Sequence, residues 1–247
     1  MNEARIKACL SVVIPCFNEE KTIRPLLLRV LDQNLVGEVI VIDDCSVDNS
    51  QLEISKVGDS RVKYLRNEKN LGKGASVSIG LNLAVFDYVV IQDADLEYSP
   101  EEFPRLLAPM LDGRADAVLG SRFLTYDSRR ALYYWHRLGN NFLTTLSNML
   151  TNLDLTDMET CYKVMGLAFA KRMNIQENRF GLEPEIVAKL AALNARVYEV
   201  PISYRGRTYG EGKKITWKDG ISAVRCIILY NSPWKKKAFL KVNSFEE

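Results

Sequence analysis

Two aspartates separated by one residue are candidate ligands for a metal ion. Asp93 and Asp95 follow the apolar run 88–92, which is typical of a buried strand. Residues two apart on an extended chain face the same side, and Glu97 continues that phase as a third ligand. Carboxylate oxygens beside substrate phosphates suit Mg²⁺ or Mn²⁺. Acids at strand ends also cap turns and helices, so the spacing alone leaves both interpretations open.

A second pair of acids ends another apolar run. Asp43 and Asp44 close the stretch 38–43. An acid at the end of the second strand of a nucleotide-binding half can bind a ribose or the edge of a base. The composition of residues 44–50 is equally typical of a turn. This pair indicates a nucleoside pocket only in combination with other motifs.

Several common kinds of site are excluded by the sequence. There is no G-x-x-x-x-G-K-[ST] loop, and the glycine cluster 72–74 does not follow a strand as G-x-G-x-x-G, which argues against P-loop NTPases and Rossmann dehydrogenases. The single histidine, His136, excludes a His-rich metal centre, and no G-x-S-x-G elbow accompanies it. The five cysteines lack zinc-ligand spacing, and a disulfide framework is not expected.

The charge of the chain is balanced overall but unevenly distributed. A net charge of +2 over 247 residues argues against a general nucleic-acid binder. Residues 205–247 hold ten Lys or Arg and four Asp or Glu, which gives +6 there and −4 in the rest. This indicates a phosphate-bearing substrate or an anionic membrane surface, with a solvated helix face and tail as the alternative. Met1–Ala8 is polar and no apolar run approaches the roughly 20 residues of a membrane span, so we expect a cytoplasmic protein.

The elements that must position these residues alternate in the first half of the chain. Short runs rich in Val, Ile and Leu predict strands at 10–14, 38–43, 62–65, 88–92 and 117–121. Helices are predicted between them at 19–32, 48–57, 73–84 and 100–111. In the last, Ser99 is the expected N-cap, with Glu102 three residues on. Repeated β-α alternation favours a parallel, doubly wound sheet, in which ligands bind at the carboxyl ends of the strands.

The pattern changes after Arg122. We predict helices at 130–151, 182–193 and 217–230, and strands at 161–165 and 197–202. A basic loop containing glycines spans 205–214. No linker or repeat interrupts the chain, so one domain is expected. Its halves would be about 9–122 and about 123–230, with a basic tail at 231–247.

Five motifs in order resemble glycosyltransferase family 2, the inverting class of GT-A type that uses nucleotide-diphospho sugars. They are found at 10–20, 41–50, 70–74, 92–96 and 120–122. Further motifs at 157–163, 182–186, 197–204 and 207–214 resemble dolichyl-phosphate mannose synthases and bacterial polyprenyl-phosphate hexosyltransferases. The resemblance covers roughly residues 9–215 and implies an α/β fold with a Rossmann-like, mixed and mostly parallel sheet. Cys161, Glu97 and the stretch 212–214 depart from the usual pattern.

The resemblance also implies roles for individual residues. Asp93 and Asp95, with Glu97, would hold Mg²⁺ or Mn²⁺ on the donor diphosphate, and Asp95 would act in catalysis. The donor would contact a set of residues from the first half and the basic loop: Pro15, Asn18, Glu19, Asp43, Asp44, Asn70, Gly72, Lys73, Asp93, Ala94, Arg207 and Lys213. The loop 207–214 would fold over the diphosphate.

The acceptor is the point on which two mechanisms differ. A phosphate monoester is already anionic near pH 7 and needs cations more than a base. The resemblance places a phosphate clamp at Arg122, Arg137, Asn141 and Lys163, with Arg122 in a catalytic role. A sugar hydroxyl would need a carboxylate base, for which Asp157 and Glu159 lie in the right region. The first mechanism gives hexosyl transfer to a polyprenyl phosphate, and the second gives transfer during polysaccharide or glycolipid synthesis.

Membrane contact would follow from a lipid acceptor. Aromatic residues at 133–136 and the Trp-Lys-Lys-Lys stretch 234–237 suit a membrane interface, although core packing and a solvated tail explain them equally well. We expect a protein peripheral to the cytosolic face of a membrane. A partner subunit that anchors it in the membrane is compatible with this sequence. A phosphohydrolase with a D-x-D nucleophile fits Val89–Asp95 locally, but that class places the motif at its first strand. A non-catalytic nucleotide-sugar sensor is disfavoured by the complete set of acids and cations.

Overall fold

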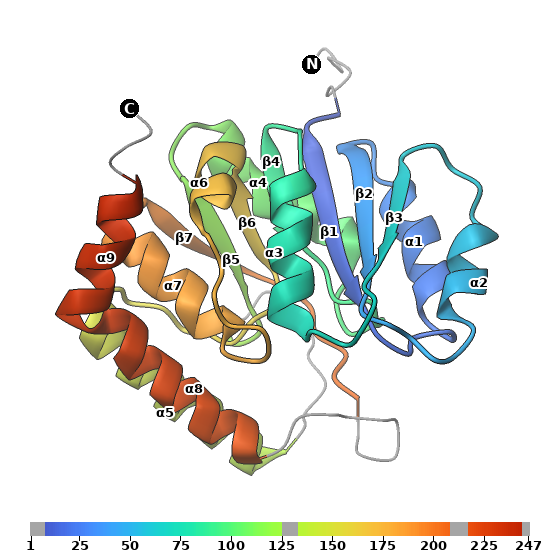
Figure 1. Ribbon diagram of the computed structural model, residues 1–247. Helices are drawn as coiled ribbons and strands as arrows, with labels where there is room; N and C mark the ends of the chain where they lie inside the picture. The colour runs from blue at the N-terminus through green and yellow to red at the C-terminus, as the bar shows by residue number, and fades with distance from the viewer. Residues whose placement is uncertain (1–7, 125–132, 208–216, 244–247) are drawn as a thin grey trace.

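A seven-stranded sheet with the order β3-β2-β1-β4-β6-β5-β7 runs through the centre of the protein (Figure 1). The computed structural model describes residues 8–124, 133–207 and 217–243, and the side chains of the last segment from residue 220. The strands are β1 (Leu10–Cys16), β2 (Val36–Asp43), β3 (Val62–Arg66), β4 (Tyr88–Ile91), β5 (Ala117–Ser121), β6 (Lys163–Gly166) and β7 (Val197–Pro201). The helices are α1 (Ile23–Leu31), α2 (Ser50–Ser55), α3 (Lys73–Leu83), η1 (Pro100–Glu102, 3₁₀), α4 (Phe103–Leu111), α5 (Tyr134–Thr151), α6 (Leu167–Arg172), α7 (Leu182–Ala192), α8 (Trp217–Asn231) and α9 (Pro233–Asn243).

The sheet is mixed because β6 alone runs antiparallel to its neighbours β4 and β5, while the other pairs are parallel. The predicted α/β fold with a mostly parallel sheet is therefore confirmed. The reversal has a consequence for the site. Since β6 begins where β4 and β5 end, the segment 157–162 that precedes it lies at the same edge as the predicted metal ligands Asp93 and Asp95.

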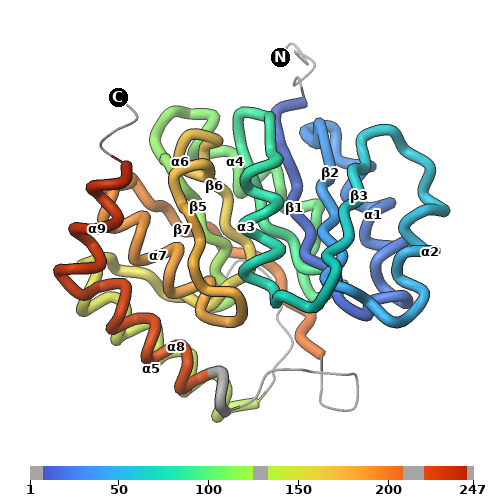
Figure 2. Tube along the Cα trace, in the orientation of Figure 1, coloured from blue at the N-terminus to red at the C-terminus, as the bar shows by residue number. Residues whose placement is uncertain are grey.

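The core forms around strands that are buried on both faces. In β1, Leu10, Val12, Val13 and Ile14 are completely inaccessible to solvent. Helices α3 and α6 cover one face of the sheet, and α1 and α4 cover the other, as the ribbon and the tube both show (Figures 1 and 2). Gly80 lets α3 approach the sheet, since a Cβ there would lie 2.2 Å from Val13.

The segment between α6 and α7 docks onto the N-terminus of α3. The amides of Gly74 and Ala75 donate to the carbonyl oxygen of Asn178 at 2.9 and 3.3 Å. Gly72 has φ +99°, and a Cβ there would lie 2.2 Å from that same oxygen. Glycine is required here by both the backbone conformation and the close approach. This contact brings the start of α7 beside the start of α3.

Several element predictions need correction. The side chain of Ser99 does not cap the helix; its hydroxyl accepts from Arg29 at 3.4 Å, and the first turn is the 3₁₀ helix η1. The carboxylate of Glu102, the expected partner in a capping box, accepts instead from the amide of Ser203. Residues 233–243 form helix α9 where a tail was expected, and α6 was not predicted. The predicted start of α5 falls partly outside the described residues.

An outer layer of helices lies beside one end of the sheet. Helices α5 and α8 pack against each other and extend past the edge where the parallel strands end, while α7 lies between them and the sheet (Figures 1 and 2). Helix α9 contacts α7 and α8. Within the described residues, no helix combines the length and apolarity that a membrane span requires.

Candidate functional site

A cavity of about 580 Å³ opens where the parallel strands end. Most residues predicted for the site line it: Pro15, Glu19, Asp44, Asn70, Gly72, Lys73, Asp93, Ala94, Asp95, Glu97, Arg122 and Arg207. Six others do not line it: Asn18, Asp43, Arg137, Asn141, Asp157 and Lys163. Lys213 and Lys214, in the predicted covering loop, lie outside the described residues. The sheet therefore brings together residues from both halves of the chain.

The two adjacent acids at the end of β2 serve different purposes. Asp44 lines the cavity, and its carboxylate accepts from the amides of Leu71 and Gly72 at 2.8 and 2.7 Å. Asp43 is fully buried away from the cavity and accepts from Tyr64 and Arg66 at 2.7 and 2.9 Å. The turn interpretation therefore describes Asp43 better than the predicted donor contact. Asp44 fixes the loop that carries the glycine cluster.

Asn18 also has a local structural role. It adopts φ +54°, its amide donates to Ser46 Oγ at 3.0 Å, and its side-chain oxygen accepts from Val47 at 2.8 Å. These bonds tie the turn after β1 to the turn after β2. In this structure Asn18 therefore links two turns and does not line the cavity.

The acids that follow β4 are each held by a cation. Lys73 Nζ lies 2.8 Å from Asp93 and 3.0 Å from Glu183. Arg207 Nη2 lies 2.6 Å from Asp95, and its Nε lies 3.1 Å from Glu97. Burial alone would raise the pKa of Asp93, but Lys73 outweighs it and lowers that pKa. Burial and the charges of Asp93 and Glu97 raise the pKa of Asp95 to about 7.

The donor chemistry around Asp95 fits a divalent cation. Burial is the largest cause of the raised pKa of Asp95, and the charges of Asp93 and Glu97 add to it, so a bound cation would stabilise the ionised form of this carboxyl group. Two carboxylates completed by substrate phosphate oxygens are a usual ligand set for Mg²⁺. Among the described residues no three acidic, Cys or His side chains gather as a metal site. Glu97, predicted as the third ligand, accepts instead from Tyr204 at 2.7 Å and from Arg207.

A paired arginine faces the other end of the cavity. Arg122 donates from Nε and Nη2 to both carboxylate oxygens of Asp157, at 2.6 and 2.7 Å. Asp157 is completely buried and does not line the cavity. Arg122 also donates to the side-chain oxygen of Asn140 at 3.2 Å. The guanidinium is thus held in one orientation by Asp157. The catalytic role expected for Asp157 stays a prediction, and in this structure its carboxylate adjoins the cavity only through Arg122.

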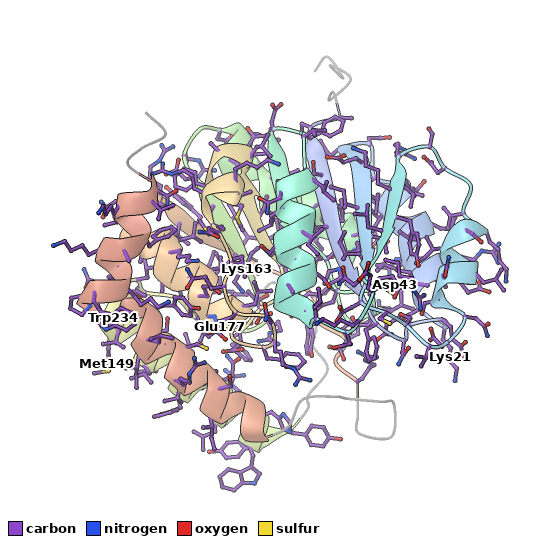
Figure 3. The ribbon with its side chains drawn as sticks, in the orientation of Figure 1. Lys21, Asp43, Met149, Lys163, Glu177 and Trp234 are labelled. Atoms are coloured by element: carbon purple, nitrogen blue, oxygen red, sulfur yellow. The ribbon has the colours of Figure 1, made fainter. Side chains whose placement is uncertain are left out.

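The other members of the predicted phosphate clamp are placed differently. Arg137 is exposed, and its guanidinium lies 5.0 Å from the ring centre of Phe123, which Arg122 also approaches at 5.7 Å. Asn141 faces outward on α5, since one residue turns a helix by about 100° and Asn140 takes the inward position. Lys163 is buried in the interior (Figure 3), where its Nζ donates to the carbonyl oxygens of Met158 and Thr160. The prediction that Lys163 contacts an acceptor phosphate is therefore corrected.

Several cavity residues were not assigned a site role from the sequence. They are Cys16, Phe17, Ser76, Tyr98, Cys161, Arg179, Phe180, Glu183 and Tyr204, together with Glu159, which was considered only as a base. Glu183 and Tyr204 fall inside the motifs at 182–186 and 197–204, so the motif boundaries contained the signal. No local pattern marked Tyr98 or Phe180, and only the tertiary fold brings Tyr98 within 5.3 Å of Tyr204, ring centre to ring centre.

Comparison with known proteins decides the family. A family model described as Glycosyl transferase family 2 matches residues 11–172, more than half of the chain. The chain belongs to glycosyltransferase family 2. This confirms the resemblance inferred from the five motifs, and the glycosyltransferase fold and enzyme class that it implied.

Relatives of this glycosyltransferase include enzymes named for lipid phosphates. It is 26% identical over 211 residues to a dolichol-phosphate mannosyltransferase of Pyrococcus furiosus, covering 83% of this chain and 58% of that protein. It is also 26% identical over 215 residues to an undecaprenyl-phosphate mannosyltransferase of Micrococcus luteus, covering 81% of this chain and 85% of that protein.

Solved structures agree on the fold of this glycosyltransferase. Glucosyl-3-phosphoglycerate synthase from Mycobacterium tuberculosis, in complex with UDP, matches with a TM-score of 0.69 at 19% identity, over 91% of this chain and 80% of that one. The same enzyme with Mn²⁺, UDP and glucosyl-3-phosphoglycerate matches with a TM-score of 0.68 at 19% identity, over 90% and 80%. At this identity the likeness concerns the fold.

Proposed function

We propose that this glycosyltransferase transfers a hexose, mannose or glucose, from a GDP- or UDP-linked donor to a polyprenyl or dolichyl phosphate. An oxygen of the lipid phosphate forms a bond to the anomeric carbon of the sugar. The bond between that carbon and the donor diphosphate breaks, the nucleoside diphosphate leaves, and the configuration inverts. The relatives named for dolichol phosphate and undecaprenyl phosphate support this class of acceptor.

The pairing of Arg122 with Asp157 is the observation that favours a phosphate acceptor over a hydroxyl acceptor. Asp157 was the candidate base for a hydroxyl acceptor, and both its oxygens are engaged by the guanidinium. The group presented to the cavity is the cation, which suits an acceptor that is already anionic. Arg137 shares the Phe123 ring with Arg122, so a second cation lies in the same neighbourhood.

The donor would lie along the edge of the sheet. Pro15, Glu19 and Asn70 would contact its nucleoside, and Lys73 and Arg207 would neutralise its diphosphate together with the predicted Lys213. Asp93 and Asp95 would hold Mg²⁺ or Mn²⁺, which stabilises the charge on a departing diphosphate. Arg207 and Lys73 already lie beside these acids, so the side chains that balance their charge are within reach of the phosphates.

One observation favours a second candidate function, transfer to a sugar hydroxyl in polysaccharide or glycolipid synthesis. Glu159 lines the cavity, and its Oε1 atom is buried without a hydrogen-bond partner among the described residues. A carboxylate in that position could act as a base toward a hydroxyl. Its pKa is raised to about 8, so the base form would be the minority below pH 8.

A matched pair of acceptors tests the proposal. The protein is incubated with radiolabelled GDP-mannose or UDP-glucose, Mn²⁺, and either undecaprenyl phosphate or the free alcohol undecaprenol. We expect label to enter the lipid only with the phosphate, and Arg122→Ala to reduce this transfer by at least about 100-fold, as loss of a charge-assisted clamp of about 2.7 kcal/mol does. Equal transfer to a hydroxyl acceptor, or an unaffected Arg122→Ala variant, would reject the phosphate acceptor.

The proposal includes peripheral contact with the cytosolic face of a membrane. Exposed apolar side chains gather on the outer helices, among them Trp135 and Met149 on α5 and Trp234 on α9. Met149 and Trp234 lie on the side of these helices away from the sheet (Figure 3). The basic stretch 235–237 follows Trp234. Aromatic residues beside lysines are suited to the interface of an anionic bilayer.

A further inference from the structure

Glu159 is a partly buried acid with one oxygen that is fully buried. It lies on the segment before β6, lines the cavity, and leaves Oε1 buried without a hydrogen-bond partner among the described residues. A buried carboxylate oxygen without a partner costs free energy, because water no longer solvates it. The side chain that carries this atom lines the cavity and is only partly buried, so a ligand in the cavity can supply the missing hydrogen-bond donor.

A second acid shares this wall. Glu183 at the start of α7 also lines the cavity, and its Oε1 accepts from Lys73 at 3.0 Å. Burial and the charge of Glu183 raise the pKa of Glu159 to about 8, against the opposing charges of Lys163 and Arg122. Glu159 is therefore mostly protonated near pH 7, and Glu183 is neutralised by Lys73, so this wall offers carboxyl oxygens as hydrogen-bond acceptors to the uncharged hydroxyl groups of a ligand.

The order of the strands indicates which part of a donor reaches this wall. The neighbours β2, β1, β4 and β6 follow one another across the sheet. The predicted nucleoside residues lie at or after the carboxyl ends of β1, β2 and β3, and the acids for the diphosphate follow β4. A nucleotide sugar is linear in the order nucleoside, diphosphate, sugar, so its sugar continues to the start of β6, which Glu159 precedes by four residues.

We propose that Glu159 determines donor specificity by accepting hydrogen bonds from hydroxyl groups of the transferred hexose. The inference rests on the proposed function and adds the recognition of the sugar to it. A carboxyl group presents two oxygens side by side that can hydrogen-bond to two adjacent hydroxyls, and one of them accepts even when the group is protonated, so it responds to the configuration of those hydroxyls. A hexose whose hydroxyl points elsewhere leaves the buried oxygen unpaired, and sites built on hydrogen bonds reject such ligands strongly.

Glu102 provides a matched control. Its Oε2 is also buried without a partner among the described residues, and burial raises its pKa as well. Its other oxygen accepts from the amide of Ser203, and Glu102 does not line the cavity. Glu159→Gln and Glu102→Gln therefore remove the same chemical group from similar surroundings, one beside the cavity and one away from it.

The test compares donors with and without their sugar. Titration calorimetry with Mn²⁺ measures the dissociation constants of UDP, GDP, UDP-glucose and GDP-mannose for the wild type and both variants. For the nucleotide that binds, we expect Glu159→Gln to raise the dissociation constant of the nucleotide sugar by about tenfold or more, a loss of about 1.4 kcal/mol of binding free energy. The dissociation constant of the nucleoside diphosphate should change by less than about twofold. Glu102→Gln should change neither.

Three results would overturn the inference while the proposed function stands. Unchanged affinity for the nucleotide sugar would mean that Glu159 does not contact the hexose. An equal loss of affinity for the nucleoside diphosphate would mean that Glu159 contacts the diphosphate or its metal and not the hexose. Unchanged binding with a lower kcat and a shifted pH profile would make it a base. If the wild type binds none of the four nucleotides, the proposed function itself fails and this inference with it.

A donor panel gives a second readout. The ratio of kcat/KM for UDP-glucose to that for UDP-galactose, or for GDP-mannose to GDP-glucose, reports discrimination between epimers. We expect Glu159→Gln to narrow this ratio by at least about fivefold and Glu102→Gln to leave it unchanged. A ratio that is preserved in Glu159→Gln while overall activity falls would contradict a specificity role.

Discussion

Asp157 holds Arg122 through both of its carboxylate oxygens, at 2.6 and 2.7 Å from Nε and Nη2. The acid is completely buried, while the side chain of the arginine keeps 16% of its exposure and faces the cavity. The guanidinium also lies 5.1 Å from the ring centre of Tyr204. This arrangement presents a fixed, planar cation to an acceptor and leaves the acid little freedom to act as a base.

The first prediction concerns this pair. Asp157→Asn removes one partner of a buried ion pair, so we expect the free energy of unfolding to fall by about 3 kcal/mol. The released guanidinium should also bind a phosphate acceptor less well, raising its KM more than it lowers kcat. Urea unfolding and acceptor titrations measure the two effects.

An exposed ion pair serves as the control for Asp157→Asn. Asp112→Asn removes the partner of Arg114 at the surface, and it should lower the free energy of unfolding by less than about 1 kcal/mol. If Asp157→Asn lowers the free energy of unfolding no more than Asp112→Asn does, and raises activity toward a hydroxyl acceptor, then Asp157 does not position Arg122.

The second prediction concerns Arg207 and metal binding. Its guanidinium occupies the region beside Asp95 and Glu97 that a cation would share, so the two compete. We expect Arg207→Gln to tighten Mn²⁺ binding in the absence of nucleotide by roughly tenfold, about 1.4 kcal/mol, and to weaken binding of the nucleotide sugar. Electron paramagnetic resonance of free Mn²⁺ measures the first effect. Arg205→Gln, two residues away and exposed, should leave Mn²⁺ affinity unchanged.

The third prediction concerns Lys73, the partly buried lysine at the start of α3. Burial alone would lower the pKa of Lys73, but Asp93 and Glu183 outweigh it and hold that pKa above its ordinary value. Lys73→Met would leave both acids without their shared cation, and we expect the free energy of unfolding to fall by about 3 kcal/mol. Adding Glu183→Gln should restore at least about 1 kcal/mol, because the two residues are coupled. Strictly additive losses in chemical denaturation would argue against the coupling.

The fourth prediction is a pH dependence of stability. The pKa of Glu159 is raised to about 8 in the folded protein, so between its unfolded value of about 4.3 and 8 the folded state binds more protons than the unfolded state. Its contribution to stability is present at acid pH and is lost as the pH rises through 8. Glu159→Gln should therefore gain stability relative to the wild type as the pH rises from 5 to about 8.

A group with the opposite shift gives the control for this pH dependence. Arg29 lowers the pKa of Glu101 through a hydrogen bond, so the contribution of that acid is lost only as the pH falls. The free energy of unfolding of Glu101→Gln should differ from that of the wild type with the same sign at every pH above about 5. Parallel unfolding curves for Glu159→Gln and the wild type from pH 5 to 8 would show that Glu159 titrates normally.

The fifth prediction concerns the outer helices. If the exposed residues of α5 and α9 contact a bilayer, the double variant Trp135→Ala, Trp234→Ala should bind vesicles of phosphatidylglycerol about tenfold less well in sedimentation. Binding should weaken with salt and fall in phosphatidylcholine alone. Leu52→Ala, an exposed apolar residue on α2, is the control. Equal binding by all three proteins would assign the aromatic residues to another role.

The family, the alternation of strands and helices, and most of the residues that line the cavity could be predicted from the amino-acid sequence. These depend on local signals: apolar runs predict buried strands, and the chemistry of parallel sheets places acids such as Asp93 and Asp44 at the strand ends. The order of five motifs was sufficient for the family because each is carried by contiguous residues.

Which of these side chains line the cavity depends on tertiary contacts. Asp43 and Asp44 are adjacent, yet the first bonds to Tyr64 and Arg66 while the second lines the cavity, because successive strand-end residues point to opposite sides. Asn140, and not the predicted Asn141, contacts Arg122, because consecutive residues of a helix point in directions about 100° apart. Lys163 is buried and Asp157 is paired because partners distant in sequence surround them, and no local pattern encodes the distance between residues that only the fold brings together.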